Sequence, residues 1–269
     1  MIVAYFVWST FYAFSKLFLE HQYTLTIRSL IENIISGSYH MWFIPTIIGI
    51  YICIPLIKQI VCSKKITKYF LLLSFIFAFL IPQLINLSND FIGGNISGGM
   101  NVIKGFFDEM NMHFVLGYTF YFILGYYLSC IDLTKKKRKV VYILGGIGFI
   151  STILLNAIVT WNTSSLCKTY YGNFNINVLF EAVSIFIFFK YANFNNNKIN
   201  LLISKLSNSC FGVYLVHVVL IDIFALIGFD TLNFSVFISV PVISLVVIIL
   251  SFFISLVLNK IPFINKWIV

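Results

Sequence analysis

The residues best suited to chemistry in this sequence are a few ionisable side chains inside or beside long apolar runs. His217 lies within such a run and follows Tyr214 by three residues and Cys210 by seven. On a helix these three side chains share one polar face. A histidine placed there could accept a proton, or it could simply hydrogen-bond to a neighbouring helix. Asp222 lies about 140° further around the same helix, which argues against a His–Asp pair within it.

Three other groups stand near the ends of apolar runs. His40 opens one run as His40-Met41-Trp42, and His113 opens another. A His–Trp pair at a membrane interface is ordinary, since aromatic rings are enriched there, so this pattern alone favours a structural role. Glu181 lies about one turn inside a run, where a carboxylate needs a cation, a proton or water. The sequence does not name its partner.

The cysteines predict neither a disulfide framework nor a metal site. They are five in number, scattered, and mostly within or beside apolar runs: Cys53, Cys62, Cys130, Cys167 and Cys210. An odd number without CxxC spacing fits neither pattern. We expect them to act as small apolar residues, and we expect no bound metal and no resident cofactor.

Composition places these groups in a protein that is immersed in lipid. Hydrophobic residues make up 60% of the 269 and charged residues 10%, whereas soluble domains average about a quarter charged. Apolar runs able to cross about 30 Å of hydrocarbon recur along the chain, and backbone groups in lipid must pair internally. We predict an all-α fold, a polytopic transmembrane bundle of about eight helices in a single domain over residues 1–269. The predicted spans are residues 2–19, 42–60, 69–87, 114–131, 140–159, 176–192, 209–228 and 234–258.

Basic residues alternate between the predicted connections as an even number of spans requires. The connections with few basic residues hold only Arg28, Lys104 and Lys168. The connections with many basic residues, together with the C-terminal tail, hold Lys58, Lys64, Lys65, Lys68, Lys135 to Lys139, Lys190, Lys198, Lys205, Lys260 and Lys266. Because Lys and Arg of short loops stay in the cytoplasm, both termini are predicted to be cytoplasmic. The net charge of +9 is then explained by topology and anionic lipid, without a nucleic-acid partner. The run 135–139 could also meet cofactor phosphates, but the topogenic role is simpler.

Two connections on the opposite side are long, residues 20–41 and 88–113. The second contains a glycine cluster, Gly93 to Gly99, without P-loop or dinucleotide-binding spacing. We predict a flexible loop there. Long outer connections are also places where a membrane enzyme could hold a polar substrate.

Four segments, in order and spacing, resemble motifs of one family. They are Ala4 to Tyr12; His40 to Ile44 followed by Tyr51 and Pro55; Phe122 to Leu128; and Cys210 to His217, with Lys260 to Phe263 closing the series. The family is the acyltransferase-3 family of bacterial integral membrane O-acyltransferases. Ala4 stands where that family usually has proline, and Cys210 where it usually has serine.

The resemblance implies transfer of an acyl group, usually acetyl from acetyl-CoA, to a hydroxyl of a cell-surface or lipid-linked glycan. It places the protein in the bacterial cytoplasmic membrane, with lipid, acyl-CoA and glycan as partners. The family's first span carries an Arg or Lys followed by the histidine regarded as catalytic, and no such pair precedes Ala4. We therefore expect a chain that resembles the family from its third span onward.

Two enzymatic hypotheses follow from the resemblance. In one, the chain is an impaired acyltransferase that retains the donor and glycan cavity. In the other, His40, His113 or His217 takes the place of the usual base. Trp42 and Tyr214 are candidate oxyanion donors or substrate contacts, with His113 and Glu181 as further substrate contacts. An exporter of polysaccharide or small solutes is the alternative from another class, although the five prolines lack the matched placement typical of inverted repeats. A non-catalytic membrane sensor module is a third possibility.

Overall fold

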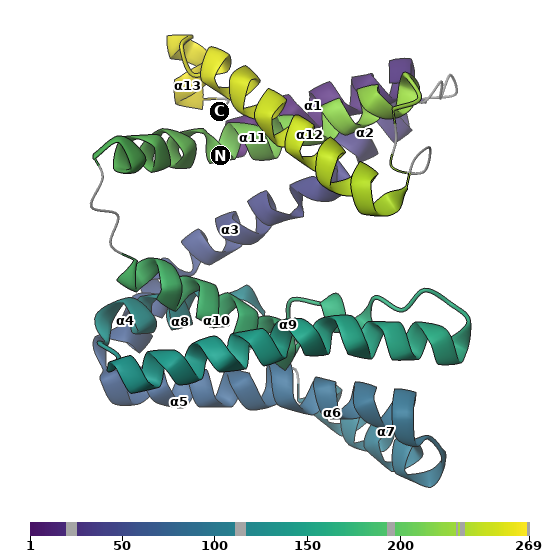
Figure 1. Ribbon diagram of the computed structural model, residues 1–269, viewed down its shortest axis with the longest axis vertical. Helices are drawn as coiled ribbons and strands as arrows, with labels where there is room; N and C mark the ends of the chain where they lie inside the picture. The colour runs from purple at the N-terminus through teal and green to yellow at the C-terminus, as the bar shows by residue number, and fades with distance from the viewer. Residues whose placement is uncertain (20–25, 111–116, 193–196, 230, 232–234, 268–269) are drawn as a thin grey trace. The chain divides into compact units, whose positions relative to one another are not determined.

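A computed structural model of the chain describes residues 1–19, 26–110, 117–192, 197–229, 231 and 235–267 (Figure 1). All regular structure in these residues is helical, which confirms the predicted all-α class. The chain divides into two compact units: unit 1 comprises Met1–Tyr51 and Phe194–Val269, and unit 2 comprises Ile52–Asn193. This division concerns packing, and the single domain over residues 1–269 stays a prediction.

Unit 1 joins the beginning of the chain to its end. Its elements are α1 (Ile2–Leu19), α2 (Ile27–Ser36), the 3-10 turn η1 (Tyr39–Trp42), α3 (Phe43–Ile52), α11 (Asn197–Leu226), α12 (Val236–Leu258) and α13 (Pro262–Trp267). Helices α11 and α12 lie side by side, and α1 contacts both α2 and α11 (Figure 1). The buried side chains of Tyr12, Met41 and Leu215 join α1, η1 and α11 in one core. This core fixes the segment that carries His40.

Unit 2 is dominated by long helices. Its elements are α4 (Ile54–Cys62), α5 (Lys64–Ser74), the π turn η2 (Phe75–Leu80), α6 (Ile81–Leu87), the π turn η3 (Ser88–Ile92), α7 (Gly94–Glu109), α8 (Tyr118–Cys130), α9 (Lys135–Thr163), the 3-10 turn η4 (Thr169–Tyr171) and α10 (Ile176–Tyr191). Helices α9 and α10 run together (Figure 1). They approach closely because Gly148 has no side chain: a Cβ there would lie 2.4 Å from the carbonyl oxygen of Asn177.

The π turn η2 explains how α5 and α6 continue through a proline. Pro82 has no N–H to donate, so an α-helix loses one hydrogen bond at that point. Just before it, the N–H of Ile81 bonds to the carbonyl of Ile76, five residues back. This wider turn rearranges the ladder next to the proline, and the helical run Lys64–Ile92 stays continuous over 29 residues.

The described residues contain several helices able to span a membrane. Five are long and apolar enough, or six if the broken pair Tyr39–Ile52 and Ile54–Cys62 counts as one span. The five are Lys64–Ile92, Lys135–Thr163, Thr169–Tyr191, Ile199–Leu226 and Val236–Leu258. The predicted polytopic character is confirmed. Two other predicted spans correspond to shorter described helices, Ile2–Ser15 and Tyr118–Cys130, so the tally of eight and the cytoplasmic termini stay predictions.

The prediction of a flexible loop at the glycine cluster was wrong. Gly93 forms a turn with a φ of 65°, and α7 begins at the next residue. The hydroxyl of Ser97 donates to Asn89 Oδ1 at 2.5 Å, and Asn101 Nδ2 donates to the same oxygen at 3.0 Å. These bonds tie the first turns of α7 to η3 and so offset the low helix propensity of glycine.

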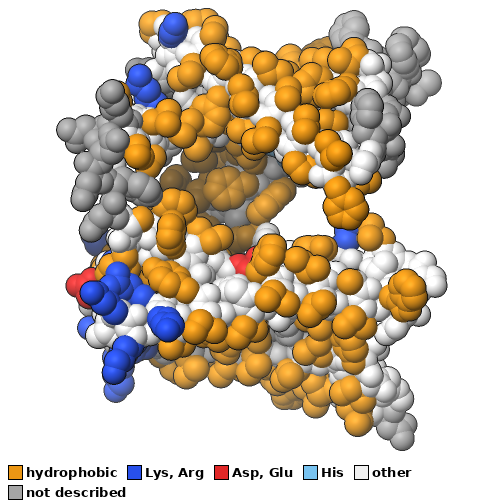
Figure 2. Space-filling model, in the orientation of Figure 1, with side chains coloured by type: hydrophobic (Ala, Val, Ile, Leu, Met, Phe, Trp, Pro, Cys, Tyr) orange, Lys and Arg blue, Asp and Glu red, His pale blue; other side chains and the backbone are white. Residues whose placement is uncertain are grey.

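Two further segments that were placed in connections are helical. Residues 27–36 form α2, and the basic run Lys135–Lys139 forms the first turns of α9. The hydroxyl of Thr134 caps α9 by accepting from the N–H of Lys137 at 3.4 Å. A hydropathy pattern ends where lipid ends, whereas a capped helix continues into water. Figure 2 shows Lys and Arg side chains gathered in unit 2 where α5 and α9 begin.

Candidate active site

His40 is the most unusual polar residue of unit 1. It lies in η1, the residue is 7% exposed, and neither of its ring nitrogens has a hydrogen-bond partner among the described residues. Burying an imidazole nitrogen without a partner costs free energy, about 1–3 kcal/mol for a typical polar group. Such a residue is a common mark of a site that binds something.

His217 comes from α11 and faces His40. The centroids of the two rings are 5.2 Å apart, with the planes at 81°. Nδ1 of His217 lies 2.8 Å from the carbonyl oxygen of Tyr214. Since a carbonyl can only accept, Nδ1 carries the hydrogen in this contact, and Nε2 of the neutral ring keeps its lone pair. The helix itself thus selects the tautomer of a possible proton acceptor.

Two tyrosines hold the histidines in place. The hydroxyl of Tyr214 donates to the carbonyl oxygen of His40 at 2.7 Å, which ties α11 to η1. The hydroxyl of Tyr12 donates to the carbonyl oxygen of Leu215 at 2.6 Å, and its ring centroid lies 4.9 Å from that of His40. The site therefore rests on three elements, α1, η1 and α11. Tyr12 was not predicted as a site residue, although it lies in the first segment of the family resemblance.

The turn before η1 depends on a glycine. Gly37 has a φ of 69°, in a region that other residues rarely adopt. A Cβ at Gly37 would lie 2.8 Å from the hydroxyl oxygen of Tyr5, and this hydroxyl donates to the carbonyl of Ile35 at 2.8 Å. Close contact between α1 and the end of α2 thus sets the direction in which the chain enters η1 and reaches His40.

The remaining predicted site residues are distributed as follows. Trp42 ends η1 and is 48% exposed, with its ring centroid 6.1 Å from that of Phe43. His113 lies outside the described residues. Glu181 belongs to unit 2, so the structure assigns it to a different set of contacts from His40 and His217.

The contacts of Glu181 answer the question that the sequence left open. The hydroxyl of Thr152, on α9, donates to Glu181 Oε1 at 2.6 Å. The same hydroxyl oxygen accepts from Asn177 Nδ2 at 2.6 Å, and Asn177 Oδ1 accepts from Gln83 Nε2 at 3.3 Å. Thr152, Asn177 and Gln83 are buried. Glu181 is therefore the end of a polar chain that joins α6, α9 and α10.

The histidine pair can do defined chemistry. His217 offers a lone pair on Nε2, and the neutral ring of His40 offers one N–H and one lone pair that no described residue occupies. A lone pair next to an unused donor can take a proton from a hydroxyl and stabilise a developing oxyanion. In the part of the chain that the structure describes, no three His, Cys, Asp or Glu side chains gather in a way that could hold a metal ion.

Comparison with known proteins identifies the family. A model of the acyltransferase-3 family, described as an acyltransferase domain, matches residues 1–260, which is nearly the whole chain. No curated protein matches the chain, and no solved structure matches it. The family resemblance inferred from short segments is thus supported over residues 1–260. This chain belongs to the acyltransferase-3 family and is a multi-pass membrane acyltransferase.

Proposed function

We propose that this chain transfers an acetyl group from acetyl-CoA to a hydroxyl of a cell-surface or lipid-linked glycan, and that the pair His40–His217 carries the reaction. The observation that supports this assignment is the burial of an unpartnered His40 against the ring of His217. Transfer of an acyl group to oxygen needs a base for the hydroxyl and a donor for the oxyanion, which is the pair of functions that two imidazoles can divide.

In this proposal His217 is the base. The glycan hydroxyl attacks the thioester carbonyl while Nε2 of His217 takes its proton, giving a tetrahedral intermediate and an imidazolium. The C–S bond then breaks, and the imidazolium returns the proton to the leaving thiolate. The contact of Nδ1 with the carbonyl of Tyr214, at 2.8 Å, would become stronger on protonation because the ring gains positive charge.

His40 has the complementary role of oxyanion donor. A neutral imidazole carries one N–H, and that of His40 has no competing acceptor among the described residues. In a buried site a donor that is already in place is worth more than in water, because no solvent has to reorganise as charge develops. The hydroxyl of Tyr214 positions His40 by donating to the backbone carbonyl of His40. Because this hydroxyl is already engaged, Tyr214 is not assigned the role of oxyanion donor. Trp42, half-exposed beside His40 in η1, is assigned to contact with the substrate.

The test is acetyl transfer by the purified protein in lipid nanodiscs. Radiolabelled acetyl-CoA would be the donor, and peptidoglycan fragments or O-antigen stripped of esters by mild alkali would be the acceptors. His217→Ala should lower kcat by about 10²- to 10⁴-fold, the usual contribution of a general base. His40→Ala should lower kcat by about 10²- to 10³-fold, as loss of one oxyanion donor does. Phe237→Leu, an exposed position of the same unit, is the control that should leave the rate unchanged.

A structural role for the pair predicts a different result. If both histidine variants fold and keep the wild-type kcat, the assignment of these residues is wrong. The impaired-enzyme hypothesis gives a third outcome, in which the wild-type chain itself transfers no acetyl under conditions where another family member does. Tyr214→Phe tests whether Tyr214 positions His40 or contacts the substrate. If it only positions His40, the variant should lower kcat and leave KM for the acceptor unchanged.

A further inference from the structure

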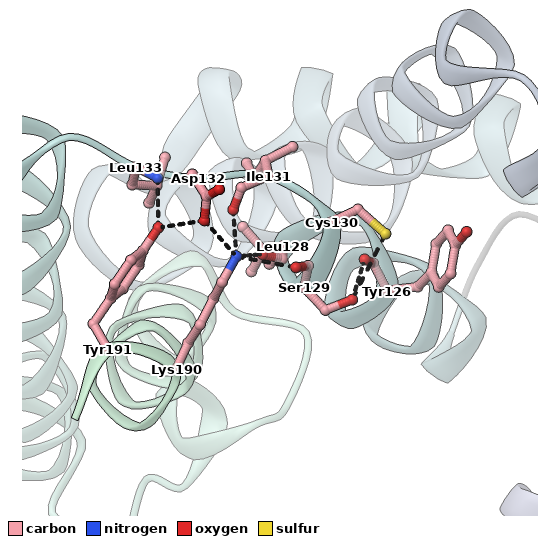
Figure 3. A network of polar contacts seen from close by, with 9 residues as sticks. All are labelled: Tyr126, Leu128, Ser129, Cys130, Ile131, Asp132, Leu133, Lys190 and Tyr191. Carbon is pink, nitrogen blue, oxygen red and sulfur yellow. Dashed lines mark hydrogen bonds and ion pairs between the residues drawn. The ribbon is translucent and has the colours of Figure 1, made fainter. Parts of the chain in front are cut away.

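At one end of unit 2, a network of hydrogen bonds and one ion pair satisfies the ammonium group of a lysine (Figure 3). Lys190, near the end of α10, has a side chain that is 19% exposed. Its ammonium donates to the carbonyl oxygens of Leu128 at 2.9 Å and Ser129 at 3.0 Å, and to that of Ile131. Asp132 Oδ1 lies 3.6 Å away. Lys190 thus satisfies the final carbonyls of α8, which have no partner within the helix.

Arg138, a second cation at this end of unit 2, has a donor atom without a partner, unlike Lys190. The guanidinium carbon of Arg138 lies over the ring of Tyr191, 4.2 Å from its centroid. The Tyr191 hydroxyl is itself held, since it accepts from the N–H of Leu133 at 2.6 Å. Yet Nε of Arg138 is buried without a hydrogen-bond partner, and no described residue forms an ion pair with this arginine. The contact with the ring of Tyr191 helps to hold this guanidinium, and its Nε is a donor without an acceptor.

The charges around Arg138 favour an anion. Lys135, Lys136, Lys137 and Lys139 are exposed on the same first turns of α9. The acid of this segment, Asp132, lies 3.6 Å from the ammonium of Lys190 and forms no ion pair with Arg138. A phosphate suits this setting because a guanidinium binds it through two parallel hydrogen bonds and lysines add unspecific attraction.

An apolar groove begins at the same place. It has a volume of about 690 Å³ and is lined by Ser129, Ala182, Ile185, Phe186, Phe189 and Lys190. The four apolar residues follow helical spacing along one face of α10. From the first of them to Lys190 the helix rises about 12 Å, at roughly 1.5 Å per residue. This is close to the depth of one leaflet, about 15 Å of hydrocarbon.

We propose that this end of unit 2 binds one anionic phospholipid. Its phosphate lies on the edge of the Arg138 guanidinium among the α9 lysines, and one acyl chain occupies the groove along α10. The Lys190 network lies between the phosphate site and the acyl-chain groove. Its polar atoms are already paired with one another, so they do not compete for the phosphate. A soluble phosphate compound would use the basic half of the site and leave the apolar half empty, so the combination favours a lipid.

The experiment compares lipids retained by the purified full chain. The protein would be extracted in mild detergent, supplied with phosphatidylglycerol or phosphatidylcholine, and examined by native mass spectrometry. The wild type should retain phosphatidylglycerol about tenfold more strongly, the difference that one charge-assisted contact of about 1.4 kcal/mol gives. Arg138→Gln should remove this preference. Arg28→Gln is a matched control, because the other arginine of the chain is exposed and paired with Glu32 at 2.9 Å.

A second variant tests the groove independently of charge. Ala182→Phe fills the apolar half and should lower retention of both lipids, while a monodisperse elution profile shows that the protein is folded. Equal retention of the two lipids by the wild type, or an unchanged preference in Arg138→Gln, would show that the proposal is wrong. Displacement of phosphatidylglycerol by millimolar inorganic phosphate or CoA would overturn it as well, because the site would then belong to a soluble phosphate.

Discussion

Thr152 is the position where the polar chain of unit 2 is most easily tested. Its hydroxyl donates to Glu181 Oε1 and accepts from Asn177 Nδ2, each at 2.6 Å. Thr152→Val keeps the shape of the side chain and removes both contacts. Thr152→Ser keeps the hydroxyl and removes only a methyl group, so it is the matched control.

The expected magnitude follows from which groups lose partners. Asn177 Nδ2 has a second acceptor, the carbonyl of Tyr170 at 2.8 Å, so its loss is limited to about 0.6 kcal/mol, the average for interhelical hydrogen bonds in membranes. The carboxylate of Glu181 loses a charge-assisted bond, which is worth about 1.5–3 kcal/mol. We therefore expect Thr152→Val to destabilise the protein by roughly 2–3.5 kcal/mol, about 30- to 400-fold in the ratio of folded to unfolded protein. Thr152→Ser should cost less than about 1 kcal/mol, the loss of one buried methyl.

A double-mutant cycle measures the pair itself. In Glu181→Met the hydroxyl of Thr152 keeps a second acceptor, the carbonyl of Gly148 at 3.0 Å, so this variant leaves the hydroxyl satisfied. In the Glu181→Met background, Thr152→Val should lose the contact with Asn177 and the bond to the carbonyl of Gly148, but no bond to residue 181. The coupling energy between the two positions should be about 1.5–3 kcal/mol, obtained from reversible unfolding in mixed micelles with increasing SDS.

Two results would refute this reasoning. One is a coupling energy near zero, which would mean that Glu181 relies on water or another group rather than on Thr152. The other is equal stability of Thr152→Val and Thr152→Ser, which would mean that the hydroxyl contributes nothing.

Three further changes probe the close contacts. Gly148→Ala places a methyl against the carbonyl of Asn177 at 2.4 Å and should cost about 1–3 kcal/mol in the same unfolding assay, whereas Gly146→Ala, where a Cβ meets nothing within 4 Å, should be tolerated. Gly37→Ala combines a strained backbone, about 1–3 kcal/mol, with a Cβ 2.8 Å from the Tyr5 hydroxyl, so acetyl transfer should fall and melting temperature should drop. Lys190→Met leaves the three carbonyls without their donor and should expose the end of α8 to faster amide hydrogen exchange, with an unchanged exchange rate contradicting the capping role.

The membrane-spanning helices could be predicted because lipid leaves the backbone one main solution. The helices α2 and α7, which lie outside the predicted spans, could not be found by hydropathy alone. For α2 the signals were present: Thr26 caps the helix by accepting from Ser29 N–H, Ile27, Leu30 and Ile31 follow helical spacing, and Gly37 ends it. For α7 the glycines argued against a helix, and the side-chain bonds that stabilise it join residues 8 and 12 apart in sequence.

The site was predictable in part. His40 and His217 stood out as polar residues of apolar segments, but no spacing rule brings them together. Their meeting depends on tertiary contacts such as that of the Tyr214 hydroxyl with a backbone carbonyl 174 residues earlier. Tyr12 could not be given a role for the same reason, since its hydroxyl bonds to a carbonyl 203 residues later. Backbone acceptors have no sequence signature, so partners of this kind are visible only in the fold.

The wide turn before Pro82 also determines where the length of this helix can change. An i to i+5 turn contains one residue more than an α-turn, so a single deletion within Phe75–Leu80 would let the ladder revert to ordinary α geometry. Because the wide turn absorbs its extra residue, the side chains beyond the deletion would keep their directions relative to those before it. Gln83, which donates to Asn177 and accepts from the N–H of Ile176 at 2.6 Å, would still face its partners. A deletion elsewhere in Lys64–Ile92 would instead rotate the side chains beyond it by about 100°, so homologues that lose one residue from this span should lose it at the wide turn.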